Sequence, residues 1–358
     1  MSGLVRPAAL RVVRPGSAAR HVVPMTDTRV GGVSGVGGSG RDASGAVSVG
    51  DYLPPIRAVW VYRLQRGSDE HVGVVADVSI LGFADGRVRG HEAVSSDRVA
   101  GLVDHFASVP GRAELVALLH DAGEQVDRVV ASAREAPPVV DFTGTDGWRQ
   151  SVWQVPDTAG LLLADALGRA VHYIADGHHR VAASLALWER AGRPADSALL
   201  CVLYSMDGLR LRAYRRRVSG PVDPSRLRGL LAECCAVTEG APGELPSRGT
   251  RAYVDGTWLT LDPTVDRAAG VEGLDLTILQ RHVLAPLLGA VLEERVESIP
   301  VTVPLDELVS RCDADGGALF VLAPPTHRQM REIADRGQVM PPKTTYFDPK
   351  PSAGVFLR

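Results

Sequence analysis

The stretch from Ala170 to Arg180 constrains the fold more than any other part of this chain. It begins with the β-branched and aromatic residues of a buried strand, Val171, Tyr173 and Ile174. The turn dipeptide Asp176-Gly177 follows, and glycine tolerates backbone conformations that a Cβ atom penalises. Beyond it, apolar residues recur at helical spacing as far as Trp188. The pattern predicts a strand, a tight turn and a helix that begins near His178.

Polar groups gather at the predicted start of this helix. Unpaired backbone N–H groups and the positive end of the helix dipole favour a phosphate there, so Gly177 is a candidate phosphate-binding residue. His178, His179 and Arg180 add side-chain donors at the same point. Asp176 is the one acid in the cluster, and it could hold a metal ion, orient a histidine or accept a proton. We therefore predict a functional site here rather than a simple turn followed by a polar helix cap.

Composition limits the class of protein. The 358 residues are enough for one large or two modest domains, and the 45% apolar fraction supports a sizeable core. A formal net charge of -3 argues against a general nucleic-acid binder. The 4 cysteines have neither zinc-site nor disulfide spacing. We see no apolar run of membrane-span length and no signal peptide, so we expect a cytoplasmic protein without a membrane partner.

The domain organisation follows from shifts in composition. We expect residues 1–50 to be a poorly ordered N-terminal segment that ends in a Gly/Ser-rich linker at 31–50. A core domain over 51–220 carries the Asp176-Gly177 turn, and 221–358 form a C-terminal α/β portion whose tail docks on the core. The further expected elements are paired strands at 59–62 and 72–78, helices at 95–107 and 112–134, a hairpin of 198–204 with 209–214, and an amphipathic helix at 274–292 kinked at Pro286.

Other candidate site residues lie outside the central turn. Glu92, beside His91, follows a predicted strand. It could act as a general base or as a magnesium ligand. The alternative is an exposed acid near a helix start, where the helix dipole favours negative charge. Lys343 and Lys350 lie in a proline-braced tail with two threonines, which suits phosphate contact. Within an arginine run, Arg216 is a pocket candidate, whereas the arginines at 210 and 212 fit the wet face of an edge strand.

Several blocks together resemble the bacterial proteins grouped as domain of unknown function 1015. The blocks, in family order, are 59–63, 73–78, 90–92 with Arg98, Ala175-Asp176-Gly177-His178-His179-Arg180, 275–289, and 340–350, which reads MPPKTTYFDPK. The likeness covers residues 55–358. The chain departs from the family pattern at Val181, where a tyrosine is usual, at Arg215, where a histidine is usual, and in a shortened N-terminal segment at 23–27.

The resemblance carries expectations for fold and function. The family's Asp-Gly-His-His-Arg signature is similar to that of the ParB/sulfiredoxin-like superfamily, which implies an α+β (mixed α/β) nucleotide-binding core with an additional mixed-sheet subdomain. Superfamily members bind nucleotide phosphates on this turn, and they include free serine kinases and CTP-binding DNA-partitioning proteins. The implied activity is a kinase that uses ATP or ADP with Mg²⁺ to phosphorylate the hydroxyl of free serine or a related hydroxy amino acid.

Each candidate residue then has a role. The phosphate-binding set is His91, Gly177, His178, His179, Arg180, Arg216, Lys343 and Lys350. The catalytic set is Glu92 as the base, Asp176 as magnesium ligand or positioning group, and His178. Two alternatives stay open: a nucleotide-binding regulatory module without turnover, and a metal-dependent hydrolase built on His91, His178 and Asp176. Adjacent helical residues point about 100° apart, so His178 and His179 do not easily share one ion. A homodimer is possible under any of these readings.

Overall fold

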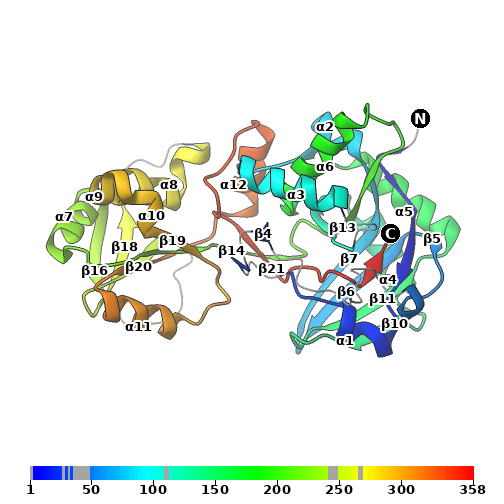
Figure 1. Cartoon of the computed structure of the whole chain (residues 1–358), viewed down its shortest axis with the longest axis horizontal. Coiled ribbons are helices and arrows are strands. Elements are labelled where there is room, and N and C mark those ends of the chain that lie inside the picture. The colour runs from blue at the N-terminus through cyan, green and yellow to red at the C-terminus, as the bar shows by residue number, and fades with distance from the viewer. Residues whose placement is uncertain are drawn as a thin grey trace. The chain divides into compact units, whose positions relative to one another are not determined.

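The structure, a computed structural model, describes residues 3–25, 29–30, 33–34, 49–108, 113–240, 249–264 and 269–358 (Figure 1). The chain forms two compact units. Unit 1 consists of Met1–Gly90, Val94–Arg210 and Pro349–Arg358, and unit 2 of His91–Ala93 and Leu211–Asp348. The chain thus leaves unit 1, builds unit 2 and returns to unit 1 for its last residues. The predicted linker, residues 31–50, lies for the most part outside the described residues.

Unit 1 is built on a nine-stranded mixed sheet in the order β10-β11-β6-β7-β13-β9-β12-β8, with β1 paired to β7. Its strands are β1 (Val5–Arg6), β6 (Trp60–Arg66), β7 (Asp69–Ser79), β8 (Val88–Arg89), β9 (Val116–His120), β10 (Val140–Thr143), β11 (Arg149–Gln154), β12 (His172–Asp176) and β13 (Ala198–Ser205). Parallel pairs, β9 with β13 and β8 with β12, occur beside antiparallel ones. This mixture confirms the predicted α+β class.

Helices cover the sheet of unit 1 and close its core. They are α2 (Ile80–Ala84), α3 (Ser96–Ser108), α4 (Glu124–Ala133), α5 (Asp157–Arg169) and α6 (His178–Arg190). One face of the sheet, including Val74, Leu118 and Leu203, packs against apolar side chains of α2, α4 and α5. Helices α3 and α6 join through a smaller cluster of Leu102, Val103 and Ala183. Figure 1 shows these helices around the strands.

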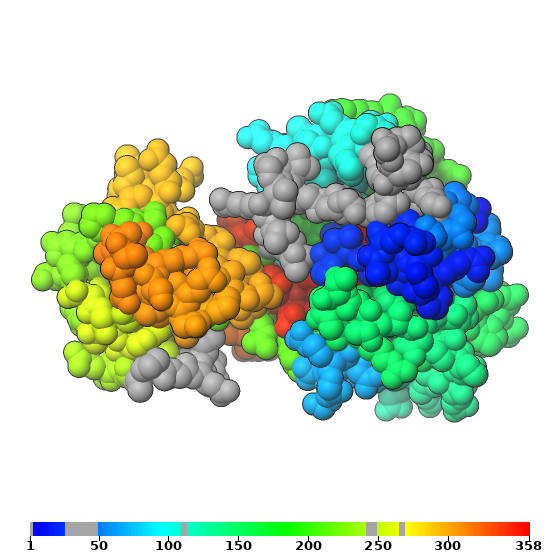
Figure 2. Space-filling view, turned by 60° about the horizontal axis from the view of Figure 1, so that its bottom comes forward, coloured from blue at the N-terminus to red at the C-terminus, as the bar shows by residue number. Residues whose placement is uncertain are grey.

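The N-terminal segment corrects our expectation of poor order within residues 3–25. It contains β2 (Ala8–Val12), the turn η1 (Pro15–Ser17) and α1 (Ala18–His21), and Figure 2 shows it in dark blue on the surface of unit 1. Strand β2 pairs with β5 (Ile56–Ala58) and with β22 (Phe356–Leu357). His21 and Ser17 each contact the Asp51 carboxylate at 2.7 Å, next to η2 (Val49–Asp51). Strand β2 is ordered because its alternate residues are buried. In the sequence this alternation is too short to be told apart from an irregular segment.

Strands β3 (Arg29–Val30) and β4 (Val33–Ser34) pair with each other. The C-terminal residues 349–358 belong to unit 1, where Phe356 is fully buried. Its ring lies 6.4 Å from that of Trp60 and 5.8 Å from that of Tyr62. The last residues of the chain therefore complete the face of the sheet that lies opposite α4 and α5.

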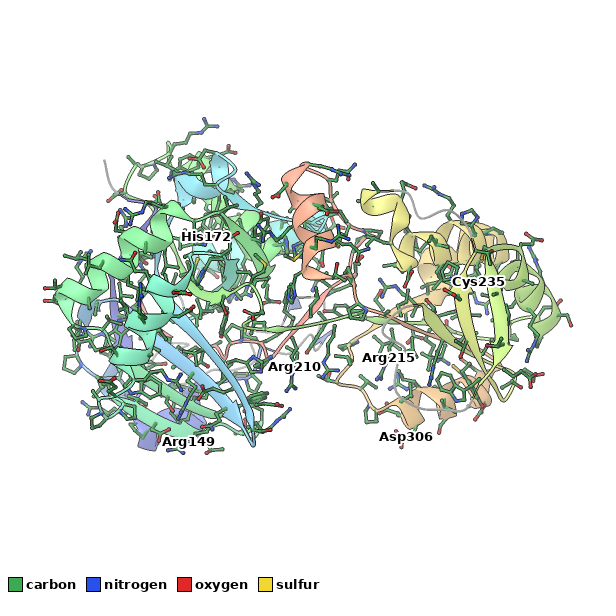
Figure 3. All side chains as sticks on the ribbon, turned by 180° about the vertical axis from the view of Figure 1, so that it is seen from behind. Arg149, His172, Arg210, Arg215, Cys235 and Asp306 are labelled. Atoms are coloured by element: carbon green, nitrogen blue, oxygen red, sulfur yellow. The ribbon has the colours of Figure 1, made fainter. Side chains whose placement is uncertain are left out.

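Unit 2 has its own six-stranded sheet in the order β16-β18-β17-β20-β15-β19, and its paired strands are all antiparallel. The strands are β15 (Arg215–Val218), β16 (Cys235–Glu239), β17 (Thr250–Val254), β18 (Thr257–Pro263), β19 (Val296–Ile299) and β20 (Ala318–Leu322). Its helices include α7 (Pro224–Cys234), α11 (Leu305–Asp315) and α12 (His327–Asp335). Apolar side chains of α7 and of residues 276–288 cover one face, and α11 packs on the other. Figure 3 labels Cys235 at the start of β16.

The predicted helix at 274–292 is a series of short segments. They are η3 (Gly270–Gly273), α8 (Asp275–Leu279), the π-helical turn η4 (Gln280–Leu284), α9 (Ala285–Leu288), η5 (Gly289–Val291) and α10 (Leu292–Arg295). Pro286 has no N–H with which to form a helical hydrogen bond, and the turn before it has π-helical hydrogen bonds instead. Gly289, at φ 54°, ends α9. By length and composition alone, Asp275–Arg295 is long and apolar enough to span a membrane, a test that the core helix of a soluble protein also passes. It also supplies Leu276, Leu284 and other buried residues to the core of unit 2.

Two further predictions of secondary structure are wrong. The helix expected over 112–134 begins only at Glu124, and Val116–His120 form the buried strand β9. A buried strand flanked on both faces is apolar throughout, so its leucines also match helical spacing. The expected hairpin of 198–204 with 209–214 does not form, because β13 pairs with β7 and β9. Instead β14 (Arg210–Arg212) pairs with β21 (Tyr346–Asp348).

Candidate functional site

The strand–turn–helix predicted from the sequence is confirmed. Strand β12 ends at Asp176, and α6 begins at His178. Gly177 lies between them at φ 106°, in the left-handed region that penalises a Cβ atom. Gly177 is the residue before the helix and has no side chain with which to cap it. The start of α6 carries the positive end of the helix dipole, which favours an anion.

The carboxylate of Asp176 holds two cationic side chains at this turn. Its Oδ2 accepts a hydrogen bond from Arg180 Nη2, one helical turn later, and its Oδ1 accepts one from Lys350 Nζ at 2.8 Å. Arg180 Nη1 also donates to the backbone oxygen of Leu115 at 2.5 Å. The three charged side chains are between 11 and 18% exposed, so they are held in place but reachable. One carboxylate thus positions two cations beside the start of α6.

Arg180 lies directly over the glycine of the turn. A Cβ atom placed on Gly177 would lie 3.0 Å from Arg180 Nη2 and 3.1 Å from its Nε. The glycine is needed both for its backbone angle and for the space that the guanidinium occupies. Asp-Gly-His-His-Arg is therefore a single packed arrangement, in which the first and last side chains pair across the glycine.

The two histidines of the motif face different neighbours in unit 1. The ring of His178 lies against Gly90, where an added Cβ atom would be 3.3 Å from its Cδ2. His179 Nε2 accepts the backbone N–H of Ser95 at 3.1 Å, next to the start of α3. Both side chains are half-buried. The different contacts agree with the expectation that these neighbours do not share one ion.

A second group of predicted residues gathers in unit 2 around the tail residues 340–345. His91 is fully buried, and its Nε2 is 2.9 Å from Thr345 Oγ1. Burial lowers the pKa of His91 to about 4, so the ring is neutral at physiological pH. The oxygen of His91 accepts the N–H of Met340 at 2.7 Å, and Glu92 forms a parallel bridge with Met340. His91 thus holds the backbone beside Glu92 and is itself inaccessible to a ligand.

Arg216 supports the same tail from strand β15. It is 1% exposed, and its Nη2 donates to the backbone oxygens of Pro342 and Lys343 at 3.0 and 2.9 Å. Burial lowers the pKa of Arg216 to about 10, an effect that the nearby Glu92 carboxylate opposes. The predicted phosphate ligand is therefore a buried side chain that orders the tail.

Lys343 has a left-handed backbone at φ 61°, uncommon for a residue with a Cβ atom. Its Nζ lies 3.2 Å from the Tyr214 hydroxyl and 4.9 Å from the centre of that ring. Strained backbone of this kind persists where surrounding contacts impose it. The strain here coincides with the two carbonyl groups that Arg216 holds.

The predicted residues thus fall into two sets. Asp176, Gly177, His178, His179, Arg180 and Lys350 come together in unit 1, and His91, Glu92, Arg216 and Lys343 belong to unit 2. Across the ranges that the structure describes, no group of three or more His, Cys, Asp or Glu side chains is arranged to hold a metal ion. At Asp176 the donor set is one carboxylate already paired with two cations. These residues do not fit a protein-held Mg²⁺ or the three-ligand metal centre of a hydrolase.

Sequence reasoning missed three groups that shape the turn: the Leu115 carbonyl, Gly90 and the Ser95 N–H. The Leu115 carbonyl was hidden because its segment was assigned to a helix. Every residue has a backbone N–H or carbonyl, so the sequence does not show which of these groups will bind a side chain. The pairing of strands is what brings β9 beside β12. Gly90 carried a signal, since a glycine at the end of a strand indicates close approach of another group.

Comparison with known proteins places these observations in a family. The model of the family described as "Protein of unknown function (DUF1015)" matches residues 54–278. No curated protein sequence matches the chain.

Among solved structures, a mutant free serine kinase in complex with ADP is similar at a TM-score of 0.42 and 14% identity, covering 78% of this chain and 91% of that one. A free serine kinase in complex with AMP has a TM-score of 0.41 and 14% identity, covering 78% and 90%. SbnI with C-terminal truncation from Staphylococcus aureus has a TM-score of 0.40 and 13% identity, covering 76% and 82%. These identities and TM-scores are low. The family match spans well over half of the chain and includes the Asp-Gly-His-His-Arg turn, so this chain belongs to the DUF1015 family.

Proposed function

We propose that this protein is a nucleotide-dependent kinase with a ParB/sulfiredoxin-like core, which phosphorylates the hydroxyl of free serine or a related hydroxy amino acid. The observation that carries the proposal is the turn at Gly177. There Arg180 and Lys350 converge on the single carboxylate of Asp176, beside the start of α6. Two cations, one anion and a helix dipole leave a net positive site, which suits the phosphates of ATP or ADP.

The proposed phosphate contacts use groups that are already positioned. The backbone N–H groups at the start of α6 donate to phosphate oxygens, and Arg180 contributes guanidinium donors in a fixed plane. Because Asp176 orients both Arg180 and Lys350, neither side chain has to be ordered when the nucleotide binds. Phosphoryl transfer depends mainly on positioning and on neutralising charge, and these groups supply both.

The remaining roles follow from the contacts of each residue. Glu92 takes the proton of the acceptor hydroxyl, while His91 and Arg216, both buried, position Glu92 and the tail. His178 lies at the first position of α6 and contacts the transferred phosphate. Asp176 acts as a positioning residue. A magnesium ion would add charge neutralisation, but the described residues contain no cluster of three or more ligands arranged to hold it, and no role above depends on it.

The proposal is tested by incubating the full chain with ATP or ADP and a panel of hydroxy amino acids, and by detecting the phosphorylated product by mass spectrometry. We expect product with at least one of serine, threonine or homoserine. In the same assay Glu92→Gln should lower turnover by about 10²–10⁴-fold with little change in nucleotide affinity, since it keeps the shape and removes the basicity.

Arg180→Ala tests the phosphate site by itself. We expect nucleotide binding, measured by calorimetry, to weaken by about 1.5–3 kcal/mol, the scale of a charge-assisted hydrogen bond. Arg190→Ala, at the far end of the same helix, is the matched control and should bind nucleotide normally. Nucleotide binding without any product would leave a regulatory module as the function. No nucleotide binding by the folded wild type would refute the proposal altogether.

A further inference from the structure

A cavity of about 600 Å³ lies in unit 1, outside the turn at Gly177. Its walls come from the start of β7, the ends of β9 and β13, and α4. Strand β12 runs antiparallel to β9, so that His172 is opposite His120 and Asp176 is opposite Ala117. The cavity, which His120 lines, is therefore at the other end of this strand pair from Asp176. Its volume is typical of small-molecule sites, which span roughly 300–1,000 Å³.

Two hydrogen-bonding side chains form the floor of this cavity. His120 and Ser205 end two parallel strands and are register partners, so their side chains lie next to each other on one face. This face carries Leu118 and Leu203 into the core beneath α4. His120 is 3% exposed, and its Nδ1 accepts the N–H of Ala122 at 3.2 Å, which leaves the ring proton on Nε2.

His120 therefore presents a donor to the cavity. The side chain is almost wholly buried, and the one hydrogen bond described for its ring is the one that Nδ1 accepts. Burial and the neighbouring His172, labelled in Figure 3, lower the pKa of His120 to about 4. The ring stays neutral at physiological pH, and its Nε2–H seeks an acceptor. Buried polar groups normally have partners, so a group like this indicates a missing ligand or water.

A buried acceptor lines the same cavity. His71 is 7% exposed, and its Nδ1 is 2.8 Å from the backbone oxygen of Gly208, which makes Nδ1 the donor. Its Nε2 is therefore an acceptor, and in the described part of the chain it has no partner. This atom has almost no accessible surface, so a ligand in the cavity does not reach it, and the donors of the floor decide what binds there.

The rim of the cavity is negative. Arg134 pairs with Glu70 at 2.6 Å, and Arg210 pairs with Asp69. Asp127 and Asp207 also line the rim, both are exposed, and neither has an ion pair among the described residues. With neutral histidines, two carboxylates remain uncompensated, which favours a cationic group at the mouth.

We propose that this cavity binds a basic α-amino acid, with the carboxylate at His120 and Ser205 and the cationic side chain toward Asp127 and Asp207. A diamine would satisfy the rim and leave the floor donors without an acceptor. An inorganic anion or a nucleotide would satisfy the floor and be repelled by the rim. A free basic amino acid carries both kinds of group, an anionic carboxylate for the floor and a cationic side chain for the rim. This site is independent of the proposed kinase reaction.

The test is calorimetric titration of the full chain with L-lysine, L-arginine and L-ornithine, beside putrescine, L-norleucine and ATP. We expect saturable binding of at least one basic amino acid and at least tenfold weaker binding of putrescine and L-norleucine. The double variant Asp127→Asn/Asp207→Asn should weaken that binding by about fivefold to tenfold, as expected for two exposed charge contacts. Asp165→Asn, an exposed acid on α5, is the control and should change nothing.

A second variant addresses the floor. Ser205→Leu places an apolar side chain at the end of β13 and should abolish the binding of basic amino acids, with ATP binding unchanged. A melting curve establishes that this variant is folded. The proposal is overturned if no basic amino acid binds the folded wild type below millimolar concentration, or if binding survives both variants. Either result leaves the kinase proposal unaffected, because that proposal is tested by the nucleotide affinity of the Arg180→Ala variant.

Discussion

At the scale of single residues, burial separates two kinds of candidate. Arg180 and Lys350 are partly exposed and already oriented by Asp176, whereas His91 and Arg216 are buried and hold backbone carbonyls or hydroxyls. A motif of charged residues does not reveal this difference, since both kinds carry the same donors. Under the proposed function, the first kind contacts the ligand and the second positions it.

The buried histidines make stability depend on pH. In the unfolded chain a histidine takes up a proton near pH 6.5, whereas the folded pKa of His91 and of His120 is about 4. Between these values the unfolded state binds more protons, so acid favours unfolding. The stabilisation is complete above about pH 6.5 and is lost as the pH falls toward 4. From pH 6.5 to 5 we expect His91 to contribute a loss of up to about 2 kcal/mol.

Denaturant unfolding at a series of pH values measures this effect. His91→Asn should reduce the slope, and His282→Asn, which removes an exposed histidine, should leave it unchanged. A wild-type stability that is flat between pH 7 and 5 would contradict the assignment of neutral, buried rings.

At the scale of elements, the site depends on how β12 passes into α6. The left-handed Gly177 allows the helix to start at once after the strand, so that Asp176 and Arg180 lie one turn apart and can pair. The residue that precedes strand β9 then supplies the Leu115 carbonyl to the same guanidinium. The geometry of the turn is therefore a property of two neighbouring strands and a helix together.

Gly177→Ala should damage binding more than folding. The left-handed backbone costs an alanine about 1–2 kcal/mol, and the added Cβ atom also displaces the Arg180 guanidinium. Gly316→Ala is a matched control, because Gly316 has the same left-handed backbone at φ 71° and ψ 22°, and an added Cβ atom would meet nothing closer than 3.4 Å. We expect both variants to melt at similarly lowered temperatures, and only Gly177→Ala to lose nucleotide affinity. Equal affinities in the two variants would show that Arg180 does not depend on the glycine.

At the scale of the whole molecule, the two ends of the chain belong to the same unit. Strand β2 pairs with β22, and Phe356 packs beneath Trp60 and Tyr62. Lys350 reaches Asp176 only because the chain returns to unit 1 after building unit 2. The order of unit 1 and the charge of its candidate site therefore both depend on the last residues of the chain.

Phe356→Ala tests this dependence. Removing a fully buried phenylalanine ring costs about 3–5 kcal/mol, and we expect a correspondingly lower unfolding midpoint. Leu161→Ala, at a side chain that is 61% exposed, should change stability by no more than about 0.5 kcal/mol. A small effect of Phe356→Ala would mean that the tail is dispensable to unit 1.

The sequence by itself determined the features that depend on neighbouring residues. The apolar run, the Asp-Gly dipeptide and the helical spacing after it specify β12, the turn and α6, because backbone preference and side-chain period act over a few residues. Only the tertiary structure decided that Val116–His120 is a strand, that Lys350 pairs with Asp176, and that His120 and Ser205 share the floor of a cavity. These outcomes depend on which distant segments pair and bury each other. The spacing of apolar residues within one segment does not specify its distant partners.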